Sequence, residues 1–470
     1  MKLQKKTTSL FSMLLLHVLM FETNIKAQSN DECLQQVSIF AEYAKVKNYD
    51  AALSPWRESR ENCPSANAAI YSYGERILQQ LIEDSEGSEK DQHIDDLILL
   101  YEQWVEYFPE RKGVSEVGGI MGKKAQALLD YEKADKKTIY LSFQEAYESD
   151  PNSFTNPKHI YNYFKSLHDL FKEKNLLVSE ELLFEVYEDL SEKFVKEGDN
   201  YSKRLDALIN KEDEGSALSN VEQRNKKAFG SYINAFSVFH SNMDKIIARE
   251  ASCENLIPFY QRNFAENKGD LIWIKRATSR MYTKECTESD LFVTLVETMH
   301  QLEPSADSAY FLGYLTDKAG NTQEALKYYS EAIELEDDAY KRAAILYRLG
   351  LEFKRANKYS VARNYFQRTL QDRPSMGKAY LAIANMYAAS ANNCGDSQFE
   401  KRAVYWLAAE EARKAARVDP SVKRDADKYV ESYMGRAPSK TDIFTEGKEG
   451  QTVTFSCWIG RSVTVPSLSK

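Results

Sequence analysis

One pattern occurs three times between Ser305 and Pro420. Its first copy reads SADSAYFLGY at 305–314 and ALKYYSEA at 325–332. In this copy, small residues such as Gly313 and Ala325 alternate with bulky ones such as Tyr329. The same order of small and bulky residues returns in the two copies that follow, which indicates an internal repeat.

The second copy begins 37 residues after the first. In it, Leu349-Gly350 matches Leu312-Gly313, Ala362 matches Ala325, Phe366 matches Tyr329, and Pro374 closes the unit. The third copy has Ile383-Ala384 at the first of these positions, followed by Ala408, Ala412, Ala415 and Pro420. It also carries an insertion at about 391–401 between its two expected helices.

This pattern resembles the tetratricopeptide repeat (TPR), a helix-turn-helix unit of about 34 residues. The resemblance is clearest over Ser305–Pro420 and extends to Cys33–Pro64. It implies that small residues lie where paired helices approach closely and that bulky residues interdigitate between them. The fold class that follows is all-α, a TPR-like α-solenoid of antiparallel helix pairs, with a short C-terminal β-hairpin.

We interpret the rest of the chain as degenerate versions of the same unit. The charged run Lys211–Ser216 and the pair Glu303-Pro304 mark two soft boundaries. The predicted organisation is a signal peptide at 1–27, an N-terminal TPR-like array at 28–210, a helical connecting region at 220–304, a C-terminal TPR array with a capping helix at 305–434, and a β-hairpin tail at 441–466.

The C-terminal tail changes period after the last repeat. Ser421–Met434 predicts a final helix, and its polar residues Lys423, Arg424, Asp427 and Lys428 suit the outer face of a cap. The segments 450–459 and 462–465 alternate between faces and are rich in β-branched residues, which predicts a hairpin. The glycine-rich segment Gly113–Tyr131 is predicted to be helical throughout.

Composition limits the classes of partner. Of the 470 residues, 43% are hydrophobic and 28% charged, so a packed core is expected. The formal net charge is −9. Nucleic acids and anionic membranes both need a basic face, so neither is predicted as a partner.

The first 27 residues have the layout of a secretory signal. Lys2, Lys5 and Lys6 precede an apolar run from Leu10 to Phe21, and Ala27 offers a small residue for cleavage. That run is too short to span a bilayer, and no later stretch is long and apolar enough to do so. We therefore expect an exported protein with no integral membrane segment, in the periplasm or, alternatively, outside the cell.

Six cysteines in the remaining chain suggest disulfides, although six allow fifteen pairings. In the register that the resemblance implies, Cys33 begins and Cys63 ends one helical hairpin, and Cys253 and Cys286 flank another. Cys394, in the insertion, and Cys457, in the tail, are the two that remain. The expected bonds are therefore Cys33–Cys63, Cys253–Cys286 and Cys394–Cys457, the last of which would join the terminal hairpin to the insertion. The spacing contains no CxxC or CxxH pair, so a metal site is not predicted.

Motifs for catalysis are not found in the sequence, and we predict a protein that is not an enzyme and needs no cofactor. Gly118–Lys124 has some features of a phosphate loop, but Val117 stands where the first glycine would be, and Lys124 replaces the magnesium-binding hydroxyl. We interpret these glycines as points of close helix packing. His159 and His168 lie on aromatic faces and are expected to be core or boundary residues.

TPR arrays bind partners in a concave groove that is lined mainly by the first helix of each unit. If the resemblance holds in detail, the candidate peptide-binding residues are Tyr310, Tyr314, Lys318, Tyr347, Lys354, Arg355, Lys378 and Asn385, beside Asp307. The same side chains could instead pack against the neighbouring repeat. A chaperone-tail carboxylate clamp would need lysine at Tyr310 and Tyr347, so that type of recognition is not expected.

Two functional interpretations remain open. The first is a scaffold of the bacterial cell envelope that binds other proteins, for example in outer-membrane assembly or secretion. The second is an exported glycan- or nutrient-binding protein, in which Trp273 and Trp458 would serve as platforms for sugars. The sequence does not indicate the partner, the binding face or the oligomeric state.

Overall fold

The computed structural model describes residues 30–468, so the predicted signal peptide at 1–27 lies outside the described residues. Contacts between residues divide the chain into two compact units, 1–159 and 160–470. Unit 1 is described from residue 30 and unit 2 up to residue 468. The division falls in the first turn of helix α7 (Pro157–Lys172).

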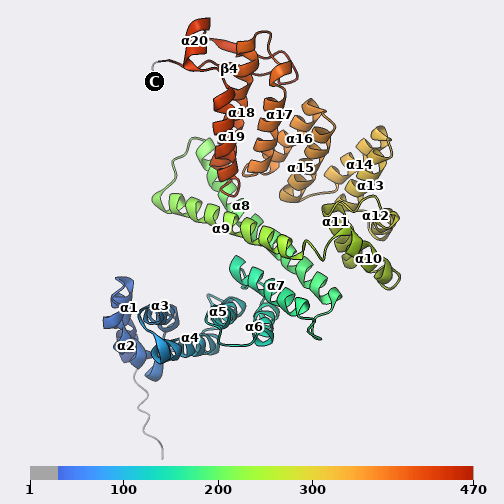
Figure 1. The fold of residues 1–470 in the computed structure, drawn as a ribbon. Coiled ribbons are helices and arrows are strands. Elements are labelled where there is room, and N and C mark those ends of the chain that lie inside the picture. Colours follow the sequence, from blue (N-terminus) through green and yellow to red (C-terminus); the bar gives the residue numbers. More distant parts are fainter. Residues whose placement is uncertain (1–29, 469–470) are drawn as a thin grey trace, which may run out of the picture. The chain divides into compact units, whose positions relative to one another are not determined.

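Unit 1 consists of consecutive helical hairpins, α1 with α2, α3 with α4 and α5 with α6 (Figure 1). Its elements are α1 (Asn30–Lys45), α2 (Tyr49–Asn62), α3 (Ala69–Asp84), α4 (Gly87–Tyr107), β1 (Glu110–Arg111), β2 (Val114–Ser115), α5 (Val117–Asp130) and α6 (Lys136–Ser149). The core of this unit lies between the hairpins and is rich in aromatic side chains, as the repeat pattern predicts.

Local sequence explains how the first hairpins of unit 1 close. Gly74 in α3 faces the indole of Trp56 in α2, and a Cβ atom at this position would lie 2.6 Å from Trp56 Nε1. Trp56 is fully buried, and its Nε1 donates a hydrogen bond to the carbonyl oxygen of Ile70 at 2.7 Å. The close approach of α2 and α3 therefore depends on a residue without a side chain.

One prediction in unit 1 was wrong. The helix expected from Gly113 begins only at Val117, because the preceding residues form the antiparallel pair β1–β2. Lys112 and Gly113 have positive φ angles of 53° and 75°, which form the tight turn of this hairpin. Gly113 therefore lies in a turn and not in a helix.

Unit 2 begins within α7 and contains the three clear repeats. Its elements are α8 (Glu180–Asp213), α9 (Asn220–Ile247), α10 (Cys253–Asn267), α11 (Leu271–Thr283), α12 (Asp290–Leu302), α13 (Ala306–Lys318), α14 (Thr322–Glu334), α15 (Ala339–Arg355), α16 (Tyr359–Asp372), α17 (Gly377–Ala389), the 3₁₀ turn η1 (Ala391–Asn393), α18 (Gln398–Val418), α19 (Lys423–Arg436), α20 (Lys440–Glu446), β3 (Thr452–Thr454) and β4 (Ser462–Thr464).

The repeated glycines of unit 2 lie where the repeat pattern requires them. A Cβ atom on Gly313 in α13 would lie 2.6 Å from Tyr329 Cδ1 in α14. One on Gly350 in α15 would lie 2.5 Å from Phe366 Cε1 in α16. Both rings are buried against the helix that carries the glycine, so the paired helices pack at a distance that only glycine permits. The predicted α-solenoid of antiparallel helix pairs is confirmed.

The long hairpin of α8 and α9 also contacts the ends of the C-terminal repeats. Asp206 in α8 accepts a hydrogen bond from the backbone N–H of Ser375 at 2.7 Å, in the loop between α16 and α17. Asp199 pairs with Arg373 at 2.8 Å in the same loop. Gly230 in α9 lies against Pro420, which follows α18. Residues more than a hundred positions apart in the sequence thus hold α8 and α9 to the repeats.

Three disulfides join the pairs Cys33–Cys63, Cys253–Cys286 and Cys394–Cys457, with Cα–Cα distances of 5.8, 5.4 and 5.6 Å. These bonds agree with the predicted pairing. The first two close the open ends of helical hairpins, and the third joins the insertion after α17 to the tail. Each bond shortens the loops available to the unfolded chain, which favours the folded state.

The C-terminal tail packs onto the last repeat. Its strands β3 and β4 form a hairpin, as predicted, with Val453 opposite Val463. The first strand is shorter than the predicted segment 450–459, because β3 ends at Thr454 and residues 455–461 form the connection to β4. Trp458 contacts the rings of Tyr359 and Tyr387 at centroid distances of 5.5 and 5.6 Å, and its Nε1 donates a hydrogen bond to Ser390 Oγ. The proposed use of Trp458 as an exposed sugar platform was therefore wrong, because the ring fastens the tail to α17.

The predicted division into arrays differs from the division into units. The charged run Lys211–Ser216 ends α8 and begins the loop to α9, inside unit 2. The pair Glu303-Pro304 joins α12 to α13 in the same unit. The array boundaries stay a prediction.

No helix within residues 30–468 combines the length and apolar character needed to cross a membrane.

Candidate functional site

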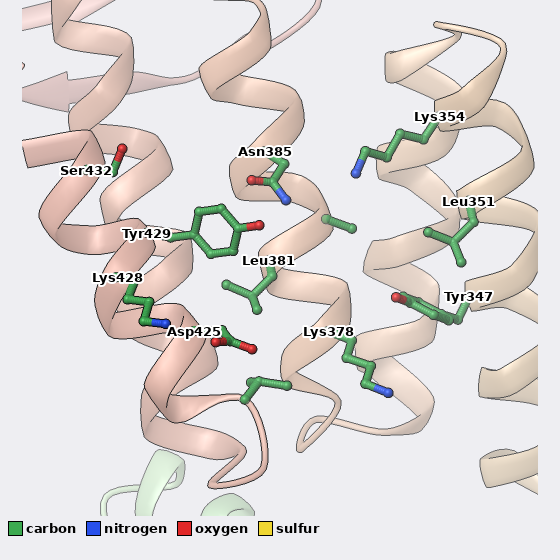
Figure 2. Close-up of a pocket in the computed structure, with 12 residues that line it drawn as sticks. Tyr347, Leu351, Lys354, Lys378, Leu381, Asn385, Asp425, Lys428, Tyr429 and Ser432 are labelled. Atoms are coloured by element: carbon green, nitrogen blue, oxygen red, sulfur yellow. The ribbon is translucent and has the colours of Figure 1, made fainter. Parts of the chain in front are cut away.

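A groove in unit 2 lies between the first helices of successive C-terminal repeats. It has a volume of about 580 Å³ and is bounded by α15, α17 and α19. Figure 2 shows side chains from all three helices converging on it. Its lining residues are Tyr347, Leu351, Lys354, Lys378, Leu381, Ala382, Asn385, Val422, Asp425, Lys428, Tyr429 and Ser432.

Helical spacing explains why these residues share one surface. Tyr347, Leu351 and Lys354 are separated by four and three positions on α15, which places them along one face. Lys378, Leu381 and Asn385 have the same spacing on α17. The second helix of each repeat packs behind the first, so this face stays open.

The groove combines an apolar floor with polar edges. Leu351 and Leu381 lie on adjacent helices, and both are partly buried. Tyr433 donates a hydrogen bond to Asn385 Oδ1, so the orientation of that amide is fixed. The Asn385 amide nitrogen consequently points toward the groove in Figure 2, where it can donate to a ligand.

The electrostatics of the groove are dominated by lysines. Within residues 30–468, the ammonium groups of Lys354, Lys378 and Lys428 take part in no ion pair. The nearby carboxylate of Asp425 lies 3.7 Å from Arg424 Nε. Burial lowers the pKa of Lys354 and raises that of Tyr347. Both shifts have one cause, which is the reduced access of water to this wall of the groove.

Four of the eight predicted binding residues line the groove: Tyr347, Lys354, Lys378 and Asn385. The other four lie elsewhere. Tyr310 is fully buried, and its hydroxyl is 2.6 Å from that of Tyr282 in α11. The expectation that Tyr310 faces a ligand was therefore wrong, because α11 covers the side of α13 that a sequence comparison places in the groove.

The remaining three predicted residues also have partners within the fold. Tyr314 is 3.1 Å from Thr287 Oγ1, and Lys318 pairs with Glu288 at 2.5 Å. Arg355 is exposed and pairs with Glu352 at 2.9 Å. These contacts place Tyr314 and Lys318 against the α11–α12 connection. Peptide binding stays a prediction, and the groove in the structure involves four of the eight predicted residues.

The sequence analysis missed the third wall of the groove. Asp425, Lys428, Tyr429 and Ser432 on α19 line it. Lys428 had been assigned to the polar outer face of a capping helix, and the structure corrects this. The spacing of these residues by three and four positions was the available signal. The pattern alone could not show that α19 presents this face to α17.

The chemistry of the described residues gives no sign of a metal centre. Within residues 30–468, no group of three or more His, Cys, Asp or Glu side chains is arranged to hold a metal ion. The histidines lie as predicted for core and boundary positions: His159 is buried, and His168 Nε2 is 3.4 Å from Glu250. The absence of enzymatic activity stays a prediction.

Comparisons with known proteins find relatives for part of the chain. The photosystem I assembly protein Ycf3 of Cuscuta gronovii is 31% identical over 112 residues, which are 22% of this chain and 67% of that protein. Ycf3 is a tetratricopeptide-repeat protein. This chain belongs to the tetratricopeptide-repeat family. The Ycf3 of Sorghum bicolor is 34% identical over 100 residues, which are 20% of this TPR chain and 58% of that protein.

Solved structures similar to this TPR protein resemble it only loosely. Yeast Tom70 has a TM-score of 0.29 and 14% identity, covering 90% of this chain and 99% of that one. Cut9, from the APC/C Cut9–Hcn1 hetero-tetramer, has a TM-score of 0.31 and 13% identity, covering 83% and 74%. Scores this low carry no argument about function. A scan against protein-family models finds no match.

Proposed function

We propose that this TPR protein is a non-enzymatic scaffold that binds an extended, acidic segment of a partner protein in the groove between α15, α17 and α19. The observation that carries the proposal is a set of three lysines, Lys354, Lys378 and Lys428, that surround an apolar floor and form no ion pair with any residue in the described range 30–468. The chain as a whole is acidic, with a formal net charge of −9. A local concentration of uncompensated positive charge on an acidic protein favours a negatively charged ligand.

The shape of the groove favours a peptide in extended conformation. Leu351 and Leu381 would contact apolar side chains, while Lys354 and Lys378 would contact carboxylates between them. Tyr347 and Tyr429 offer aromatic contact area with few rotatable bonds, which limits the entropy lost on binding. Asn385 could donate a hydrogen bond to a peptide carbonyl.

We further propose that the protein is exported and acts in the bacterial cell envelope, with the periplasm as its compartment. Three disulfides in one chain support an oxidising compartment. The partners would be other envelope proteins, for example in outer-membrane assembly or secretion. Cell fractionation tests the compartment, and recovery of the protein with the cytoplasmic fraction would contradict it.

The groove is tested with two labelled peptides of defined sequence, one of alternating glutamate and leucine and one of alternating lysine and leucine. We expect fluorescence polarisation to detect binding of the acidic peptide only. Lys378→Glu should weaken this binding by about tenfold or more, since it reverses a charge in the groove. Lys423→Glu is the matched control, because Lys423 lies on α19 outside the lining and pairs with Asp427.

Two results would contradict the proposal. Equal binding of the basic peptide would show that charge in the groove does not select the ligand. An equal loss of affinity in Lys423→Glu would show that only the net charge of the protein matters. Crosslinking in intact cells, followed by purification, would then identify the partner that the wild-type groove retains and the Lys378→Glu variant loses.

A further inference from the structure

Unit 1 contains a cavity that neither the groove nor the repeat pattern explains. Its volume is about 790 Å³, compared with about 580 Å³ for the groove, and lies in the range typical of small-molecule sites. It is bounded by α4, by the β1–β2 hairpin, by the start of α5 and by the segment 150–156 that joins α6 to α7. All of these elements belong to unit 1.

Trp104, one of the residues that line the cavity, has a buried hydrogen-bond donor with no acceptor in the described part of the chain. Trp104 on α4 is 7% exposed, and within residues 30–468 its Nε1 has no hydrogen-bond partner. Tyr71 stacks behind the indole at a centroid distance of 6.2 Å, and Lys123 Nζ lies 4.9 Å from the ring centroid. A buried indole N–H without an acceptor is unfavourable, so this wall is suited to a ligand that supplies an oxygen atom.

The rim of the cavity is formed largely by neutral side chains that can both donate and accept hydrogen bonds. They come from α3, β2 and the segment between α6 and α7, and are Ser72, Ser115, Asn152, Ser153, Thr155 and Asn156. Several hydroxyl and amide groups beside the apolar ring of Trp104 match a ligand with many hydroxyl groups. Ile120 adds an apolar surface beside Trp104.

The charges around the cavity do not favour an ionic ligand of either sign. Arg111 and Lys123 line it, but so do Glu116 and Asp150. Burial alone would raise the pKa of Asp150, but hydrogen bonds, including those from Ser115 and Ser153, hold it below its ordinary value. Asp150 therefore stays anionic and disfavours a second anion at this end of α5.

The start of α5 is also already occupied by side chains of the protein. The N–H of Gly119 donates to Ser153 Oγ at 3.1 Å, and that of Val117 to Ser115 Oγ at 3.4 Å. A Cβ atom on Gly118 would lie 2.2 Å from the carbonyl oxygen of Asp150, so this glycine serves close packing, as the sequence analysis expected. The amide groups that would bind a phosphate have other partners.

We propose that unit 1 binds a neutral, hydroxyl-rich small molecule, a mono- or disaccharide, in this cavity. One hydroxyl or ring oxygen accepts the Trp104 Nε1 hydrogen, and Ser72, Asn152, Thr155 and Asn156 on the rim bind the remaining hydroxyls. Ser115 and Ser153 already form hydrogen bonds within the protein. The β1–β2 hairpin, which is largely exposed, forms part of the wall of the site. This site is separate from the groove of unit 2 and does not depend on the function proposed for it.

The test uses the full chain and calorimetric titration with maltose, cellobiose, lactose and chitobiose, with inorganic phosphate and spermidine as charged probes. We expect at least one neutral sugar to bind with millimolar or stronger affinity and neither charged probe to bind. Trp104→Phe keeps an aromatic ring but removes the N–H, so it should weaken sugar binding by about tenfold. Trp273→Phe, in unit 2, should leave it unchanged.

A second variant covers the case in which Trp104→Phe fails to fold. Asn152 is exposed at the rim, so Asn152→Ala should keep the fold, as circular dichroism would show, and should also weaken binding. The proposal is overturned if none of the four sugars binds, if a charged probe binds in preference, or if both variants keep wild-type affinity. Peptide binding to the groove should be unaffected by either variant.

Discussion

Asp206 offers a sharp test of how α8 is held to the C-terminal repeats. Asp206 is 6% exposed, and its carboxylate accepts hydrogen bonds from the Ser375 N–H and the Tyr340 hydroxyl. Burial raises the pKa of Asp206 to about 6, and hydrogen bonds from Ser375 and the charge of Arg373 only partly oppose this effect. Asp419, nearby, raises it further. The folded structure therefore favours the protonated form of Asp206 over the charged form, compared with the carboxyl group in water.

The sign of the pH dependence follows from this shift. We call the state in which α8 contacts the loop between α16 and α17 docked, and a state without this contact open. In the docked state the pKa of Asp206 is higher than the ordinary value of 3.8, so the docked state binds the proton more tightly than the open state does. Docking should therefore strengthen as the pH falls from above 6 toward 4. A shift of about two units corresponds to ~3 kcal/mol, or about 100-fold in the equilibrium between docked and open states.

The perturbation is Asp206→Asn, which keeps the shape and the acceptor for the Ser375 N–H but removes the charge. At pH 8 this variant should dock more tightly than the wild type by up to about 100-fold. Near pH 4 the difference should largely disappear, because wild-type Asp206 is then protonated. Hydrogen exchange of the peptide that contains Ser375, compared between the two proteins at each pH, measures this difference directly.

Faster exchange in Asp206→Asn than in the wild type at pH 8 would contradict this prediction. That result would mean that the charged carboxylate stabilises the contact through its two hydrogen bonds more than burial destabilises it. A difference that stayed constant from pH 4 to pH 8 would refute it too, because the titration of Asp206 would then play no part.

Three further predictions concern stability. Replacing Cys33 and Cys63 by serine should lower the free energy of unfolding of unit 1 by ~3–4 kcal/mol, which urea denaturation would measure; no loss would exclude a native bond there. Gly350→Ala should cost ~1–3 kcal/mol because its Cβ would meet the ring of Phe366 in α16, whereas Gly435→Ala, in open space within α19, should not lower the melting temperature. Glu222→Gln should destabilise α9 at neutral pH but not near pH 2, because hydrogen bonds lower the pKa of Glu222 to about 2. Circular dichroism measures the helix content at both pH values, and an equal loss of helix at both would contradict this prediction.

Some features of the fold depend on local sequence and could be predicted from it. The glycine and aromatic positions of each repeat lie one helical hairpin apart, so a pair such as Gly350 and Phe366 specifies its own contact. The disulfides Cys33–Cys63 and Cys253–Cys286 follow from the same local geometry, because the two cysteines lie at the open end of one hairpin. For such features the required partners lie within about 35 residues.

The candidate groove could be predicted only in part, because the spacing within one helix does not show which other element packs on its surface. Spacing along α15 and α17 places Tyr347, Lys354, Lys378 and Asn385 on the exposed face of each helix. Whether that face is open depends on what packs over it. Tyr310 occupies a position equivalent to Tyr347 but is buried, because α11 lies against it. The repeat pattern is the same in both places, and only the neighbouring element differs.

The helical repeat, the pairing of its helices and the disulfides within single hairpins, Cys33–Cys63 and Cys253–Cys286, follow from the sequence, because helical periodicity and chain connectivity act over short distances. Which surfaces remain open depends on the packing of elements that lie far apart in the chain. The contact of Asp206 with Ser375, the packing of Trp458 on α17 and the cavity beside Trp104 all join segments that no repeat relates to each other. Whether a surface is buried depends on the element that packs against it, and the sequence of one helix does not specify that element.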